Sequence, residues 1–256
     1  MSGHSKWANI KHRKARMDEK RGRLFTKLGR EIMVAAKMGG GDPENNPRLK
    51  MAIQKAREAN MSSDSIARLI GRATGGGSAV ENYEELVYEG YGPGGVAVLM
   101  NILTDNRNRT AAELRYIFSR HGGSLGEAGC VAWMFDQKGL VVVEMEGHDE
   151  DEVLMLALDA GAEDVNFFEG VAEITANPAD LPGVKKVFAD SGYRINLAEV
   201  TMVPKTVVSL DDVEQARKIM QLTDALEDHD DVQAVYMNYV IPADVMAKCQ
   251  GKVGMP

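Results

Sequence analysis

GLVVVEMEGHDEDEVLMLALDAGAEDVNFFEGVAEITA, residues 139–176, is the stretch that decides the fold. It opens with an apolar run typical of a buried strand, passes into a helical pattern and ends in two short strand-like runs. With the residues up to 203, the predicted strands and helices lie at 139–144, 149–159, 164–168, 171–175, 178–190 and 194–203. Their order, β-α-β-β-α-β, is that of a split βαβ or ferredoxin-like domain.

The elements on either side of this stretch predict a second copy of the same arrangement. They are a strand at 96–103, a helix at 110–120, a strand at 131–135, a helix at 211–227 and a strand at 232–239, with a gap where a third strand belongs; a further strand is predicted at 85–89. Thr110 with Glu113 has the spacing of a capping box at the start of the first helix. The stretch 194–210 is long enough to supply both the last strand of the inserted domain and the first strand after the chain returns to the outer domain. We therefore predict one ferredoxin-like domain inserted into another, with a single larger mixed sheet as the alternative.

The first part of the chain has a helical pattern throughout. Apolar residues recur at helical spacing over 16–38, a second helix over 47–60 begins with Asn46 as its cap, and a third begins at residue 62 or 63 and ends at 72. A glycine-rich linker over 73–78 follows. The predicted fold is α+β in three domains: a helical domain at 1–78, a discontinuous α/β domain at 79–137 and 204–256, and an inserted ferredoxin-like domain at 138–203.

Charge is distributed unevenly along the chain. The 256 residues carry a formal charge of −8. Residues 1–75 hold 17 Lys and Arg against 7 Asp and Glu, a net charge of +10, whereas the remainder holds 13 against 31, a net charge of −18. Such a dipole is typical of a protein that binds nucleic acid at one end, because the acidic remainder would repel polyphosphate.

Several classes of protein are disfavoured by composition. No apolar run approaches the roughly 20 residues of a membrane helix, so no membrane partner is expected. Cys130 and Cys249 lie far apart, outside any disulfide or zinc spacing, which indicates a reducing, cytoplasmic environment. The histidines show no metal-ligand spacing, so no metal is expected. Asp18, Glu19 and the glycines that break the basic run argue against a cleaved organellar leader.

No motif supports an enzyme. GYGPGG at 90–95 matches a dinucleotide-binding fingerprint formally, but an apolar strand pattern follows it instead of a helix, which favours a hairpin turn. Acidic pairs lie in connections and at helix starts, where they solvate or cap. No nucleophile is paired with a base in a known pattern, and we therefore expect no catalytic residue and no cofactor.

The basic run GHSKWANIKHRKARMDEKRGR (3–23) contains the strongest functional signal. At about 100° per residue, five cations fall on one face of the first helix, opposite its apolar face. A polar arm with one tryptophan precedes the helix. Lys and Arg would neutralise phosphates, while the indole would stack on a base or ribose. The alternative is a solvated basic helix with Trp7 as a hydrophobic tether. The candidate nucleic-acid contacts are Lys6, Trp7, Lys11, His12, Arg13, Lys14, Arg16, Lys20, Arg23, Lys27 and Arg30.

A second candidate lies where a predicted strand ends and a helix begins. Arg107 and Arg109 would bind phosphate there, close to exposed helix amides. Alternatively, the two arginines offset the charges of Asp105 and Glu113.

Several stretches closely resemble the YebC family. They are MSGHSKWANIKHRK, FTKLGREI, KMGGGDPENNPRL, YEGYGPGGVAV and LTDNRNRTAAELR, and the likeness runs over nearly the whole chain. The family includes the PmpR-type regulators and the mitochondrial translational activator of cytochrome oxidase subunit one. The resemblance implies a three-domain α/β protein without enzymatic activity, assigned in general as a cytoplasmic DNA-binding transcriptional regulator.

Two functions remain open at this point. The first is a DNA-binding regulator of gene expression, with the second and third helices as a unit similar to a helix-turn-helix. The resemblance also implies a ribosome-associated factor that binds ribosomal RNA and relieves stalling at consecutive prolines. In either case the acidic α/β lobes would face solvent or a protein partner.

Overall fold

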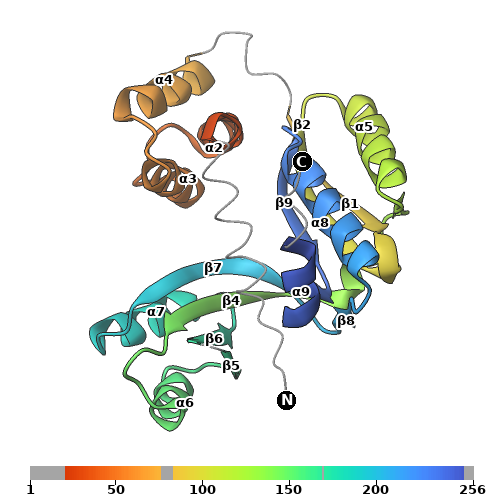
Figure 1. Ribbon diagram of the computed structural model, residues 1–256. Coiled ribbons are helices and arrows are strands. Elements are labelled where there is room, and N and C mark those ends of the chain that lie inside the picture. The colour runs from red at the N-terminus through yellow and green to blue at the C-terminus, as the bar shows by residue number, and fades with distance from the viewer. Residues whose placement is uncertain (1–20, 76–82, 169, 251–256) are drawn as a thin grey trace.

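The computed structural model describes residues 21–75, 83–168 and 170–250 (Figure 1). The helices are α2 (Arg21–Gly39), α3 (Pro47–Glu58), α4 (Ser63–Thr74), α5 (Arg107–Arg120), α6 (Glu150–Asp159), α7 (Leu181–Asp190), α8 (Val213–Glu227) and α9 (Ala243–Gln250), with 3-10 turns η2 (Pro93–Gly95) and η3 (Ala132–Met134). The strands are β1 (Glu84–Tyr91), β2 (Ala97–Thr104), β3 (Ser124–Leu125), β4 (Phe135–Glu144), β5 (Asp164–Phe168), β6 (Val171–Ala176), β7 (Ile195–Pro204), β8 (Val208–Ser209), β9 (Val232–Met237) and β10 (Tyr239–Val240). The fold is α+β: a helical domain is followed by two ferredoxin-like domains, one inserted into the other, as predicted.

The helical domain packs α2 against α3 and α4 around a small apolar core that includes Ile32, Leu49 and Ile66. Asn46 caps α3 as predicted, because its side-chain oxygen accepts a hydrogen bond from the backbone N–H of Leu49 at 3.1 Å. The Asn46 amide also donates to the carbonyl oxygen of residue 35 at 2.7 Å, which ties the start of α3 to α2.

The middle domain is built on a four-stranded sheet in the order β3-β1-β2-β9, with every pairing antiparallel. Helices α5 and α8 cover one face of this sheet and bury its largest core, which includes Met100, Leu114 and Ile219 (Figure 1). The glycine-rich stretch 90–95 joins β1 to β2, as the hairpin prediction requires. Gly94 has a φ of 72°, a conformation that favours glycine over other residues.

The inserted domain contains the sheet β5-β6-β4-β7, and α6 and α7 pack on one face of it. Strand β4 follows η3 directly and enters this sheet, while β7 returns the chain at Pro204. The two strands are paired antiparallel along most of their length. The domain limits predicted at residues 78, 137 and 203 stay predictions.

The prediction of a strand at 131–135 is wrong. Residues 132–134 form the 3-10 turn η3, and β4 begins at Phe135. The cause is Glu89 on β1, whose buried carboxylate accepts hydrogen bonds from the backbone N–H groups of residues 129, 131 and 132 at 2.6 to 2.7 Å. Those amides therefore bind a side chain instead of a neighbouring strand.

The predicted capping box of Thr110 and Glu113 is also wrong, because α5 begins three residues earlier than expected. Asn106 is the cap, and its side-chain oxygen accepts from the N–H of Arg109 at 3.1 Å. The Thr110 hydroxyl turns inward and donates to a carboxylate oxygen of Asp231 at 2.7 Å.

The strand predicted within 194–210 for the return to the outer domain is only two residues long. It is β8, which pairs in parallel with β10 and lies outside the four-stranded sheet of the middle domain. In Figure 1 helices α2 and α3 face β9, and α5 lies on the outer side of the middle domain.

Candidate nucleic-acid interface

Helix α2 separates its apolar and basic residues as its sequence predicts. Phe25, Leu28 and Ile32 pack into the core of the helical domain. Arg23, Lys27 and Arg30 lie on another face, which is turned toward the middle domain. We call these three residues the basic stripe.

The basic stripe is held against the segment 227–231, which joins α8 to β9. The Arg23 guanidinium lies 2.9 Å from a carboxylate oxygen of Asp228, and the Lys27 ammonium donates to the backbone carbonyl of Glu227. The C-terminal end of a helix carries partial negative charge, so the ammonium group of Lys27 is stabilised where it meets the end of α8. Arg23 and Lys27 are therefore bound to a carboxylate and a backbone carbonyl about 200 positions further along the chain.

Asp231 is the central residue of the contact between α2 and the middle domain. Its side chain is only 4% exposed, and Arg30, at 18%, reaches one carboxylate oxygen at 2.7 Å. The other oxygen accepts from the hydroxyls of Thr110 at 2.7 Å and Thr104 at 3.2 Å, and from Arg109 at 3.2 Å. One buried carboxylate thus joins α2, β2 and α5.

These hydrogen bonds set the protonation of Asp231. Burial alone would raise the pKa of its carboxyl group, but hydrogen bonds from Thr110, Arg30 and Arg109 outweigh burial and hold the pKa below its ordinary value. The group is therefore ionised at neutral pH, as an ion pair with Arg30 requires.

A second bridge joins the helical and middle domains through Arg48 at the start of α3. Its guanidinium bonds both carboxylate oxygens of Glu31 at 2.8 and 3.1 Å and reaches Glu85 on β1 at 2.6 Å. Hydrogen bonding to Glu31 is the main reason that the pKa of Arg48 lies above its ordinary value. In the part of the chain that the structure describes, both this bridge and the contacts of Asp231 hold the two domains together.

The fold also brings together Glu113, His229 and Asp231, a group with the ligand types of a metal site. Their atoms already have protein partners. His229 contacts Glu113 through Nε2 at 2.8 Å and accepts the backbone N–H of Asp231 at Nδ1, at 3.1 Å. Together with the four donors to the Asp231 carboxylate, these bonds make a hydrogen-bonded corner.

The structure places the predicted contacts in three groups. Lys6, Trp7, Lys11, His12, Arg13, Lys14, Arg16 and Lys20 lie outside the described residues. The basic stripe forms the contacts given above. Arg109 bonds Asp105 at 2.6 Å as well as Asp231, so it does offset Asp105, whereas among the described residues Glu113 is bound by His229 and not by an arginine. Arg107 is exposed on the first turn of α5. The binding of nucleic acid by these residues stays a prediction.

Sequence reasoning missed the partners of the basic stripe. Asp228 and Asp231 stand in a run that reads as a polar connection, EDHDD at 227–231. The one available signal was the spacing of Thr104 and Thr110 around the end of a strand, which marks hydroxyl donors but does not identify their acceptor.

No helix of the described residues is long and apolar enough to cross a membrane. A family model described as the TACO1/YebC protein N-terminal domain matches residues 5–76, and one described as the TACO1/YebC second and third domain matches residues 83–239.

Relatives of similar length match almost end to end. A probable transcriptional regulatory protein of Moorella thermoacetica is 62% identical over 250 residues, which cover 96% of this chain and 98% of the relative. Another protein of that name from Pelotomaculum thermopropionicum is 57% identical, over 94% and 99% of the two chains. The crystal structure of a conserved hypothetical protein from Aquifex aeolicus is similar with a TM-score of 0.74 and 46% identity, over 87% of this chain and 91% of that one. The chain therefore belongs to the TACO1/YebC family.

Proposed function

We propose that the protein is a non-enzymatic, cytoplasmic regulator of gene expression that binds nucleic acid through its basic N-terminal arm and helix α2. The observation that carries the proposal is the charge distribution. The first 75 residues have a net charge of +10 in a chain whose remainder is at −18, so this end attracts phosphate most strongly. The names of the relatives, probable transcriptional regulatory proteins, support regulation of transcription as the process.

The geometry suggests an order of contacts. Arg23 and Arg30 hold carboxylates, so we assign the first contacts to the arm cations that precede α2. Phosphate groups then compete with Asp228 for the exposed Arg23, whose side chain is 54% accessible. Arg30 stays with the buried Asp231, and its role is to position α2 against the middle domain.

The helical domain offers further cations for the same ligand. Arg68 and Arg72 are exposed one turn apart on α4, and Lys55 and Arg57 are exposed on α3. In this proposal helices α3 and α4 serve as a unit similar to a helix-turn-helix. Two arginines supply little base readout, which favours recognition of the backbone and its shape over recognition of sequence.

The acidic lobes would bind a protein partner in this scheme. Helix α6 exposes Leu154, Met155 and Leu158 beside a first turn that contains Glu150 and Asp151. An apolar face next to carboxylates fits a basic, apolar segment of another protein.

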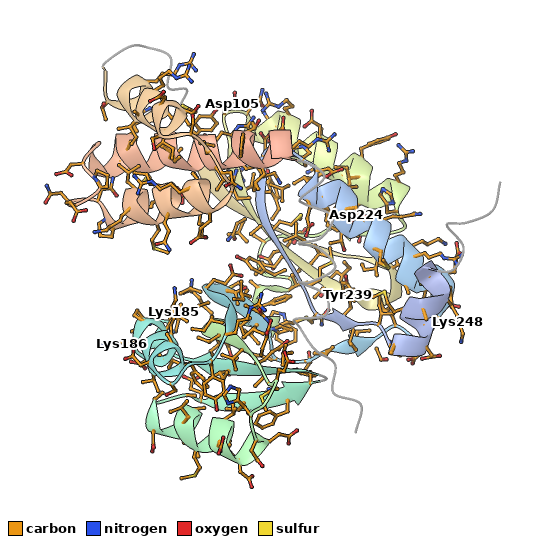
Figure 2. The ribbon with its side chains drawn as sticks, turned by 60° about the vertical axis from the view of Figure 1, so that its left-hand side comes forward. Asp105, Lys185, Lys186, Asp224, Tyr239 and Lys248 are labelled. Atoms are coloured by element: carbon orange, nitrogen blue, oxygen red, sulfur yellow. The ribbon has the colours of Figure 1, made fainter. Side chains whose placement is uncertain are left out.

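The test of the proposal is the salt dependence of binding. Arm residues Lys11, Arg13 and Lys14 are changed to Gln, and the matched control changes three cations of the acidic lobes, Lys185, Lys186 and Lys248, which Figure 2 labels. With duplex DNA, the negative slope of log K against log salt should become shallower by about 2 to 3 in the arm variant and stay unchanged in the control. Equal slopes in the two variants would contradict the proposal.

A second experiment identifies the nucleic acid. Protection of specific promoter sequences by the full chain would support DNA. Sedimentation of the native protein with ribosomal particles, abolished by high salt, would instead support the ribosome-associated function.

A further inference from the structure

Helix α5 has an unusual charge for its place in the fold. Residues 76–256 contain 13 Lys and Arg, and four of these lie on α5, which carries a single carboxylate, Glu113. Glu113 is bonded to His229 at 2.8 Å. A helix of net charge +3 therefore lies on a lobe whose overall charge is strongly negative.

The buried and exposed faces of α5 are well separated. Thr110, Leu114 and Phe118 are buried against the sheet and α8. On the opposite side Ala112, Arg115, Tyr116, Ser119 and Arg120 are all exposed. Figure 1 shows this helix on the outer side of the middle domain, away from the inserted domain.

Tyr116 is the central residue of this exposed face. Its side chain is 64% accessible, next to Arg115 and one turn before Arg120. Within the described residues, neither arginine forms an ion pair or a side-chain hydrogen bond. Ala112 and Ser119 are small, so they leave the faces of the tyrosine ring open. An exposed ring between two cations without acidic partners is the composition of a surface that stacks a base and neutralises its flanking phosphates.

The face also lies near the proposed nucleic-acid contacts. Arg109, on the first turn of α5, shares Asp231 with Arg30 of α2. Figure 2 shows Asp105, the other partner of Arg109, close to α2. A strand held at the start of α2 would therefore need to extend only along α5 to reach Tyr116.

We propose that the outer face of α5, formed by Arg115, Tyr116 and Arg120, binds an unpaired nucleotide of the nucleic acid held by the N-terminal region. The inference rests on the proposed function. An unpaired base is required because bases inside a duplex are stacked on one another and have no free face for a tyrosine. The ligand class is thus single-stranded RNA or DNA, or a loop.

The experiment measures binding of fluorescently labelled single strands of about 20 nucleotides, longer than the site sizes typical of such surfaces. The full-length chain is compared with an Arg115→Gln/Arg120→Gln variant and with a Lys185→Gln/Lys186→Gln variant. The control removes the same charge from α7, in a different domain (Figure 2). The α5 variant should bind about tenfold more weakly, and its salt slope should fall by about 1.4, at 0.7 per phosphate contact on single strands. RNA and DNA strands are tested in parallel, and weaker binding of the α5 variant to either kind of strand supports binding by the outer face of α5.

A second pair of variants tests stacking. Tyr116→Ala should weaken binding about tenfold, while Tyr116→Phe, which keeps the ring, should bind like the wild type. Binding by the α5 variants equal to that of the α7 control, while the arm variant is impaired, would overturn this inference and leave the proposed function standing. Absence of nucleic-acid binding by the wild type would overturn both.

Discussion

Replacement of Asp231 by Asn should destabilise the protein by about 3 kcal/mol. One Asp231 oxygen accepts Arg30, and the other accepts Thr104, Thr110 and Arg109. An asparagine amide has a single acceptor oxygen, so one of these sets of donors must face an NH₂ group. Loss of a hydrogen bond to a charged group costs about 1.5 to 3 kcal/mol, and buried donors left unsatisfied add to it.

The assay is thermal unfolding of the full chain, followed by circular dichroism at pH 7. A loss of about 3 kcal/mol in a protein of this size lowers Tm by about 6 to 12 °C. The matched control is Asp230→Asn, the same change at the exposed neighbouring position, which should alter stability by no more than about 0.5 kcal/mol.

The effect of pH provides a second check. The folded pKa of Asp231 is lowered, so its carboxylate stabilises the protein fully above the unfolded pKa of about 3.9 and less as the pH falls through the folded pKa. The difference in Tm between wild type and Asp231→Asn should therefore shrink when the pH is lowered below about 4. Equal Tm values for the Asp230 and Asp231 variants at pH 7, or a difference that does not change in acid, would refute the reasoning.

Three further substitutions, and one control substitution, test the local structure. Glu89→Gln should lower the free energy of unfolding by about 2 kcal/mol at pH 7, because three backbone N–H groups lose a carboxylate acceptor. Burial would raise the pKa of Glu89, but those hydrogen bonds outweigh burial and lower it, so the loss of stability should diminish below about pH 4. A loss that does not depend on pH would count against this assignment. Asn46→Ala should cost about 2 kcal/mol in urea unfolding, through the lost cap and the lost bonds to α2, and an unchanged midpoint would contradict the assigned cap. Gly90→Ala would place a Cβ 2.6 Å from the carbonyl oxygen of residue 124 and should lower stability by about 1 to 3 kcal/mol. The control Gly183→Ala adds a Cβ with no neighbouring atom within 4 Å among the described residues outside its own helix, so in the same thermal assay it should be neutral or stabilising. Similar effects at the two sites would be inconsistent with the packing described.

Local signals in the sequence predict most of the elements. Asn46 followed by a proline marks the start of α3, and the order of runs between 139 and 203 predicts the inserted domain. Both depend on interactions within a few residues, or on the repeated alternation of apolar residues, and a single sequence contains that information.

The failures share a different cause. The run VAWMF at 131–135 has the composition of a strand, but Glu89, about 40 positions earlier, captures its amides. Thr110 matches a capping box, yet its hydroxyl binds Asp231, 121 positions away. In each case a buried carboxylate from a distant part of the chain competes successfully with the local preference.

The candidate site follows the same rule. A helical wheel places the basic stripe correctly on one face of α2, but it cannot show that Asp228 and Asp231 lie opposite that face. The exposed face of α5 was missed for the opposite reason. Arg115 and Tyr116 look ordinary in the sequence, and only the absence of acidic partners among the described residues makes them notable.

The most direct test of nucleic-acid binding by the basic end is a map of cross-links in cells. Protein cross-linked to nucleic acid by ultraviolet light would be digested, and the modified peptides identified by mass spectrometry. We predict modified peptides from residues 1–30, with a second group from α5 around Tyr116. Cross-links confined to α6 and α7 of the inserted domain, or none at all, would contradict the proposal that the basic end binds nucleic acid.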